Sequence, residues 1–108
     1  MVKRAAPVPP NPEIVAKGKQ LAKQGLESYR DGDYDRAESL LKEAIAVYPF
    51  LADANLTLGR IFLIRGSATR DRAMITSART MFEMARAMDP NLREAQVLLD
   101  LFREAPPE

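Results

Sequence analysis

One spacing of small and large residues occurs twice along this chain. A small residue, a large one, a second small one and a proline follow at the same intervals in two copies: Ala37, Leu41, Ala44, Pro49 and Ala78, Phe82, Ala85, Pro90. The two copies are offset by 41 residues, whereas the glycines that precede them, Gly25 and Gly59, are 34 residues apart. A recurrence within a period of roughly 20–50 residues is typical of stacked supersecondary units, so we predict a repeat architecture.

The eight prolines lie at or beyond the ends of the periodic segments, as expected for residues that begin and end helices. Between them, apolar residues recur at intervals of three and four, and no stretch alternates for long enough to indicate a strand. The predicted helices are 12–30, 34–47, 52–64, 71–88 and 92–103. We expect Asn11 and Asp33 to cap the first two helices and Gly66 to lie just beyond the end of the third. The predicted fold class is all-α.

These motifs resemble the tetratricopeptide repeat family, whose helix–turn–helix unit has about 34 residues and places small residues where two helices cross. The resemblance covers about residues 18–104. It implies a helical solenoid of about five antiparallel helices within a domain spanning 12–104, with repeat 1 at about 18–51, repeat 2 at about 52–92 and a capping helix at about 92–104. Residues 1–11 are expected to form a flexible proline-rich tail. The residues expected to pack within and between the repeats are Gly25, Ala37, Ala44, Gly59, Ala78, Phe82 and Ala85.

The difference between the two offsets places an insertion of seven residues near 67–73. Seven residues equal about two helical turns, or roughly 10 Å, so the insertion could lengthen the flanking helices. A loop would accommodate it as well. Because the segment from Ser67 to Arg72 is polar and contains capping residues, we expect a short protruding loop that leads into an extended fourth helix.

Composition removes most catalytic chemistry. The chain has no cysteine and no histidine, so it lacks thiolate nucleophiles, the usual zinc ligands and the commonest general base. The carboxylates of Asp31, Asp33 and Asp35 suggest a calcium loop, but no Glu follows twelve positions after Asp31 to close such a site, and a turn with an N-cap explains the same residues. We expect a protein that is not an enzyme and has no cofactor or metal.

Charge gives little indication of a nucleic-acid or membrane partner, because 16 Lys and Arg balance 15 Asp and Glu. A local cluster of six arginines nevertheless keeps a nucleic-acid adaptor open as a less favoured hypothesis: Arg60, Arg65, Arg70, Arg72, Arg79 and Arg86. No segment approaches 18 consecutive apolar residues, and the N-terminus lacks the apolar run of a secretory signal. The expectation is a cytoplasmic protein without membrane insertion.

The family resemblance implies a function in binding protein segments, in a concave groove lined by the first helix of each pair. The side chains mapped to that groove are largely apolar, and an exposed apolar patch of this size points to a partner or to self-association. The contact candidates are Leu26, Tyr29, Leu56, Arg60, Leu63 and Leu101. Coverage of these residues by the capping helix or by the tail remains the alternative interpretation.

The expected partner is a protein or peptide, with a homo-oligomer as a further possibility. An alternative function is a small chaperone or adaptor for a secreted or assembly subunit. The carboxylate-gripping subclass of the family does not fit, because Ala22, Leu26, Thr57, Glu94 and Leu98 stand at the places that would need a cationic fork.

Overall fold

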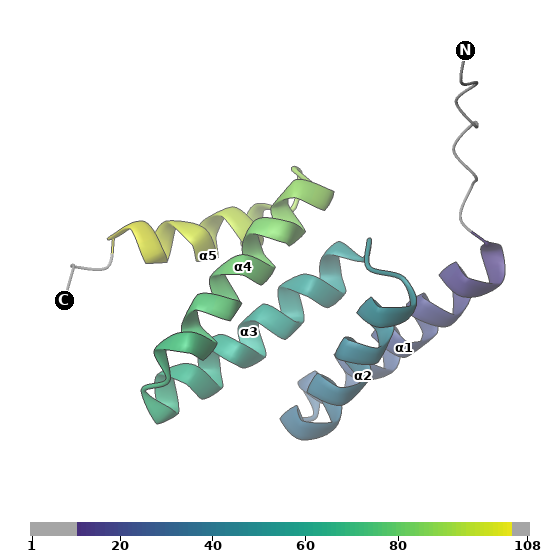
Figure 1. The fold of residues 1–108 in the computed structure, drawn as a ribbon, viewed down its shortest axis with the longest axis horizontal. Helices are drawn as coiled ribbons and strands as arrows, with labels where there is room; N and C mark the ends of the chain where they lie inside the picture. Colours follow the sequence, from purple (N-terminus) through teal and green to yellow (C-terminus); the bar gives the residue numbers. More distant parts are fainter. Residues whose placement is uncertain (1–10, 105–108) are drawn as a thin grey trace, which may run out of the picture.

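The structure is a computed structural model, and it describes residues 11–104. Within this range the chain is all-α, as predicted, and it contains no strand. Its five helices are α1 (Pro12–Arg30), α2 (Tyr34–Val47), α3 (Ala52–Thr69), α4 (Arg72–Met88) and α5 (Arg93–Glu104) (Figure 1). The predicted proline-rich tail, apart from Asn11, lies outside the described residues.

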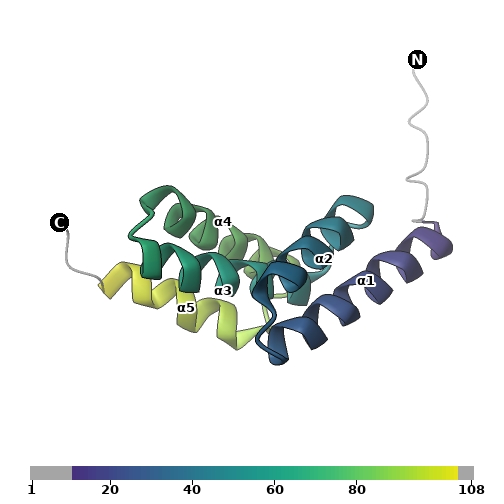
Figure 2. The same ribbon diagram turned by 90° about the horizontal axis from the view of Figure 1, so that it is seen from below.

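The helices form two hairpins and a final single helix. The first hairpin is α1 packed on α2, the second is α3 packed on α4, and α5 packs on α4. Figure 2 shows α2 and α4 along one side of the molecule and α1 and α5 along the other. The two hairpins meet where α3 contacts both α1 and α2.

Side-chain caps fix where three of the helices begin. Asn11 Oδ1 accepts a hydrogen bond from the backbone N–H of Glu13 at 2.9 Å, and Pro12 occupies the first turn. Asp33 Oδ1 caps α2 through the N–H of Arg36 at 3.2 Å, as its sequence position predicted. Asp71 caps α4 in the same way. The predicted bounds of the first two helices therefore agree with the structure.

The prediction that the third helix ends before Gly66 is wrong, and so is the protruding loop at 67–73. Helix α3 continues to Thr69, and only Arg70 and Asp71 separate it from α4. Gly66 is buried inside the helix, where an added Cβ atom would lie 2.9 Å from Cγ1 of Ile75. Because seven residues are close to two full helical turns, helices can include that many more residues with little rotation of their apolar faces.

The core consists of two apolar clusters that meet around α3. The first joins α1, α2 and α3 through Ala22, Ala37, Leu41, Ala44, Ala54, Leu58 and Ile61. The second joins α3, α4 and α5 through Leu56, Ala78, Phe82, Ala85, Ala95 and Leu99. Phe62 packs against both clusters. Within residues 11–104, no helix has the length and apolar character needed to cross a bilayer.

Candidate protein-binding groove

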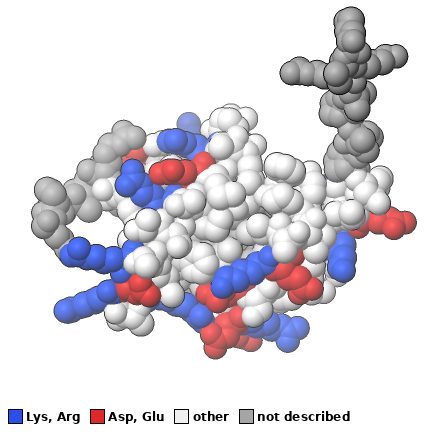
Figure 3. Space-filling model, viewed as in Figure 1, with Lys and Arg blue, Asp and Glu red and all other residues white. Residues whose placement is uncertain are grey.

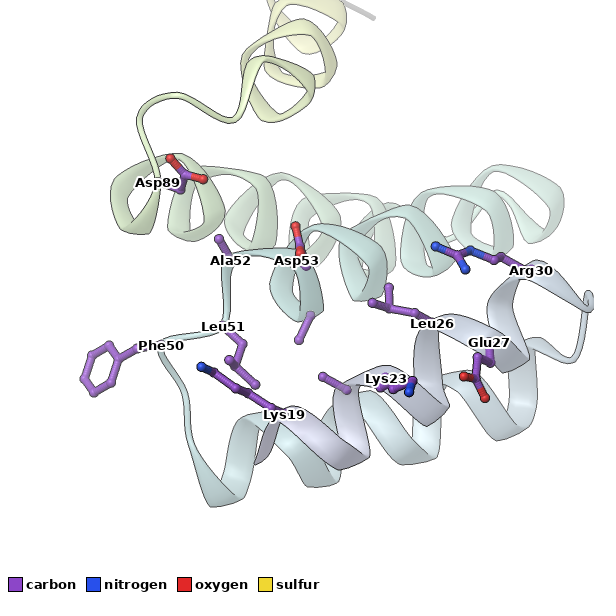
Figure 4. Close-up of a pocket in the computed structure, with 12 residues that line it drawn as sticks. Lys19, Lys23, Leu26, Glu27, Arg30, Phe50, Leu51, Ala52, Asp53 and Asp89 are labelled. Carbon is purple, nitrogen blue, oxygen red and sulfur yellow. The ribbon is translucent and has the colours of Figure 1, made fainter. Parts of the chain in front are cut away.

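A hollow with a volume of about 570 Å³ lies between α1 and the beginning of α3 (Figure 4). One wall is a single face of α1, because its residues recur at intervals of three and four: Lys19, Ala22, Lys23, Leu26, Glu27 and Arg30. The opposite side comes from the α2–α3 connection, the first turn of α3 and the end of α4: Phe50, Leu51, Ala52, Asp53, Ala54 and Asp89. We refer to this hollow as the α1–α3 groove.

Asn55 holds the backbone that forms the far wall of the groove. Its side chain is completely buried, and Nδ2 donates hydrogen bonds to the carbonyl oxygens of Pro49 at 3.2 Å and Leu51 at 2.8 Å. Both carbonyls belong to the α2–α3 connection, which carries Phe50. The connection is therefore attached to α3 by side-chain hydrogen bonds as well as by the chain itself.

Phe50 is the most exposed large hydrophobic residue among those described, with 68% of its surface accessible. Its ring meets that of Tyr48 edge to face, with the centroids 5.6 Å apart. Figure 4 shows the Phe50 side chain at one end of the groove, with its ring pointing outward. An exposed aromatic side chain is the kind of residue that often dominates binding energy at protein interfaces.

Charged side chains of opposite sign line the two walls. Figure 4 shows Lys19, Lys23, Glu27 and Arg30 on the α1 side, which gives that wall an excess of positive charge, with Asp53 and Asp89 across the groove from them. Neither lysine forms an ion pair within residues 11–104, and neither does Asp53. Asp89 Oδ1 accepts only the backbone N–H of Asn91 at 3.1 Å. These charges therefore remain available to a ligand.

The structure separates the six predicted contact residues. Leu26 lines the α1–α3 groove. Leu63 and Leu101 line a second, apolar hollow of about 230 Å³ with Ser67, Ile75 and Phe102. Tyr29 belongs to neither hollow, because it packs against the first core cluster with its ring 5.5 Å from that of Tyr34.

Leu56 and Arg60 do not occupy a free groove surface. Leu56 is only 4% exposed and packs in the second core cluster with Ala95 and Leu99 of α5. Arg60 forms an ion pair with Glu94 of α5, so its charge is already matched within the chain. These two predicted contact residues are therefore engaged with α5, and the six predicted residues do not line one common hollow.

The groove residues that sequence reasoning missed include Lys23, Glu27, Phe50 and Asp89. The three charged ones have no signal that separates them from other solvated helix residues. Phe50 does have a sequence signal of exposure, because it follows Pro49 in a short connection where no helical face can bury it. A large aromatic residue in that position indicates an exposed contact.

Most of the arginine cluster is engaged within the protein. Arg65 pairs with Asp35 at 2.6 Å and Glu38 at 3.6 Å, Arg79 pairs with Glu83, and Arg86 donates to Gln96. On the face seen in Figure 3, uncharged residues cover the centre, and basic and acidic side chains are intermixed along the lower edge. The face seen in Figure 3 is therefore not a one-sided basic surface of the kind that nucleic-acid-binding proteins present.

The acidic turn has structural roles. Asp33 caps α2 and Asp35 pairs with Arg65, and no group of three potential metal-ligating residues occurs in the part of the chain that the structure describes.

Comparisons with protein-family models and with curated proteins found no match for this chain.

Proposed function

We propose that this chain is a protein-interaction module of the tetratricopeptide type, which binds a segment of a partner protein in the α1–α3 groove. The observation that carries the proposal is the combination of an apolar floor, unpaired charges on both walls and the exposed ring of Phe50. The floor contains Ala22, Leu26, Leu51 and Ala54, and none of these four is fully exposed.

Equivalent contacts in the two hairpins support the repeat interpretation. A Cβ atom added to Gly25 would lie 2.7 Å from Cγ of Leu41, and one added to Gly59 would lie 2.6 Å from Cε1 of Phe82. Leu41 and Phe82 are both completely buried. Each hairpin thus brings a glycine of its first helix against the large residue of its second, as a duplicated unit requires.

Site-specific photo-crosslinking tests the proposal. A photoreactive phenylalanine analogue is incorporated in place of Phe50 in the full chain, which is then irradiated in extract from the native cell and examined by mass spectrometry. The matched control carries the analogue in place of Met84, which is 36% exposed on α4 and lies outside the groove. We expect defined protein adducts at position 50 and none of the same adducts at position 84.

A second variant connects the adducts to the groove itself. Leu26→Glu places a charge on the apolar floor and should abolish crosslinking at position 50, while helicity measured by circular dichroism stays near that of the wild type. Equal adducts at positions 50 and 84, or adducts unaffected by Leu26→Glu, would contradict binding in the α1–α3 groove. The identity of the adducts also distinguishes a general interaction module from a chaperone for one assembly subunit and from self-association.

A further inference from the structure

We infer that the occupant of the α1–α3 groove is an amphipathic α-helix of about three turns, and that the opposite charges on the two walls fix the direction in which it lies. This inference rests on the proposed function and specifies the class of partner.

The length and shape of the groove favour a helix. The α1 wall extends from Lys19 to Arg30, which at 1.5 Å per residue is about 16 Å, or three turns of helix. Small residues lie at the bottom of the groove, where Ala52 is partly exposed and Ala22 and Ala54 are buried, so no large side chain at these three positions keeps an apolar ridge away. Larger apolar groups occur at Leu26, Leu51 and Phe50, where a helix presents side chains at intervals of three and four.

A partner strand fits less well. Binding by strand addition requires a free row of backbone donors and acceptors on the receiving surface. Here the long wall is the middle of α1, whose backbone groups are hydrogen-bonded within the helix. The groove therefore offers side chains and not a sheet edge, which excludes binding by strand addition.

The charges oppose one another across the groove. Three cations, Lys19, Lys23 and Arg30, outnumber Glu27 on the α1 wall, whereas the charged residues of the other wall, Asp53 and Asp89, are both acidic (Figure 4). A helix with an apolar stripe, acidic residues along one flank and basic residues along the other complements both walls at once. Such a helix places its acidic flank over the lysines and its basic flank over the aspartates.

The geometry of the two charged walls selects the direction in which a bound helix lies. If a bound helix is reversed end to end with its apolar stripe still facing the floor, its two flanks exchange sides. In only one of the two directions do acidic residues face Lys19 and Lys23. Exchanging the acidic and basic flanks of the ligand should therefore reverse its direction without abolishing binding.

Three designed peptides of 14 residues test the inference. All share one leucine and alanine stripe and carry an N-terminal fluorophore: one has Glu on the first flank and Lys on the second, one has these flanks exchanged, and one has Gln on both. Fluorescence anisotropy with the full chain measures affinity. We expect both charged peptides to bind about tenfold more tightly than the Gln peptide at low salt, and to lose this advantage in concentrated NaCl.

Direction is measured by energy transfer. Because the chain has no cysteine, a single acceptor dye can be attached through Lys17→Cys near one end of α1 or through Asp31→Cys just beyond its other end. Both residues are exposed and lie outside the groove lining. The two charged peptides should give opposite ratios of transfer to the two positions, because their N-termini point to opposite ends of the groove.

Variants of the chain provide the matched control. Lys19→Glu combined with Lys23→Glu makes both walls acidic and should weaken both charged peptides about tenfold, to the level of the Gln peptide. Lys17→Glu changes a charge on α1 outside the groove and should leave their affinities within about twofold.

Equal affinity of all three peptides, or the same direction for both charged peptides, would overturn the role assigned to the charges. Failure of every peptide to bind would overturn the helical occupant. In each case the crosslinking at position 50 still decides the proposed function separately, since it makes no assumption about the shape or charge of the partner.

Discussion

Gly59 of α3 faces the ring of Phe82 in α4 so closely that an added Cβ atom would lie 2.6 Å from Cε1 and 2.9 Å from Cδ1. Cβ of Met81 lies 3.0 Å from the same point. Phe82 is completely buried and contributes to the second core cluster, so its ring has no open space into which to move. The distance between the two helices of the second hairpin therefore depends on the absence of a side chain at position 59.

Replacing this glycine should reveal that dependence. Gly→Ala in a helix interior ordinarily gains about 1 kcal/mol from helix propensity. Here Gly59→Ala should instead lower the free energy of unfolding, and Gly59→Leu should lower it by about 1–3 kcal/mol or more through overpacking. Urea denaturation measures both, with Ser77→Ala on the exposed side of α4 as the control. Unchanged or increased stability of Gly59→Ala would contradict the close contact.

Replacing Arg70 with glycine should increase the stability of the fold. It ends α3 with φ at 56°, in the left-handed region, where a side chain costs roughly 1–2 kcal/mol. Because glycine also loses more conformational entropy on folding, we expect Arg70→Gly to raise the free energy of unfolding by a net of about 0.5–1 kcal/mol. Arg70→Ala removes the same charge but keeps the unfavourable backbone angle, so it should give no gain. A gain for both variants would attribute the effect to charge.

The hairpins could be predicted from the sequence because their periodicity, caps and small-residue spacing all indicate the same helices. Asn11, Asp33 and Pro49 mark boundaries that local chemistry decides. The prediction that the third helix ends before Gly66 is wrong for a physical reason. Glycine beyond a helical segment usually indicates a stop, but at Gly66 it permits α3 and α4 to approach at Ile75, which is a tertiary contact that the local sequence does not encode.

The candidate site was less predictable. Leu26, Leu56 and Leu63 all lie on the first helices of the two hairpins and share the same apolar character. The packing of α4 and α5 buries Leu56 in the second core cluster, whereas Leu26 lines the groove. Likewise, the sequence alone allows the charge of Arg60 to be assigned to a ligand, whereas in the structure Arg60 forms an ion pair with Glu94. Docking of a terminal helix is a property of the assembled chain, and helical spacing does not reveal it.

Asn55 should be important for the shape of the groove. Asn55→Leu keeps the branched shape of the side chain but removes the donors to the carbonyls of Pro49 and Leu51, while it also removes the unpaired buried Oδ1. We expect a loss of about 1–2 kcal/mol in the free energy of unfolding. Thr57→Val is the matched control, because Thr57 is also buried but makes no side-chain hydrogen bond within residues 11–104. Equal losses for the two variants would show that the bonds to the connection contribute little.

The two faces of α5 should respond differently to the same substitution. Leu99 is 8% exposed and packs with Leu56 and Phe82, whereas Leu101, two residues later, is 54% exposed. Leu99→Ala should reduce the free energy of unfolding by about 2–4 kcal/mol, because it removes buried methyl groups and leaves a cavity beside Leu56. Leu101→Ala should change it by about 0.5 kcal/mol or less.

Hydrogen exchange provides the second measurement for this pair. If Leu99 attaches α5 to the second hairpin, Leu99→Ala should increase exchange in α5 and in the part of α3 around Leu56, and leave α1 and α2 protected as in the wild type. Leu101→Ala should leave the whole pattern unchanged. A comparable loss of protection in both variants would mean that α5 packs through its other face, and that Leu56 and Arg60 are then open to a partner as the sequence first indicated.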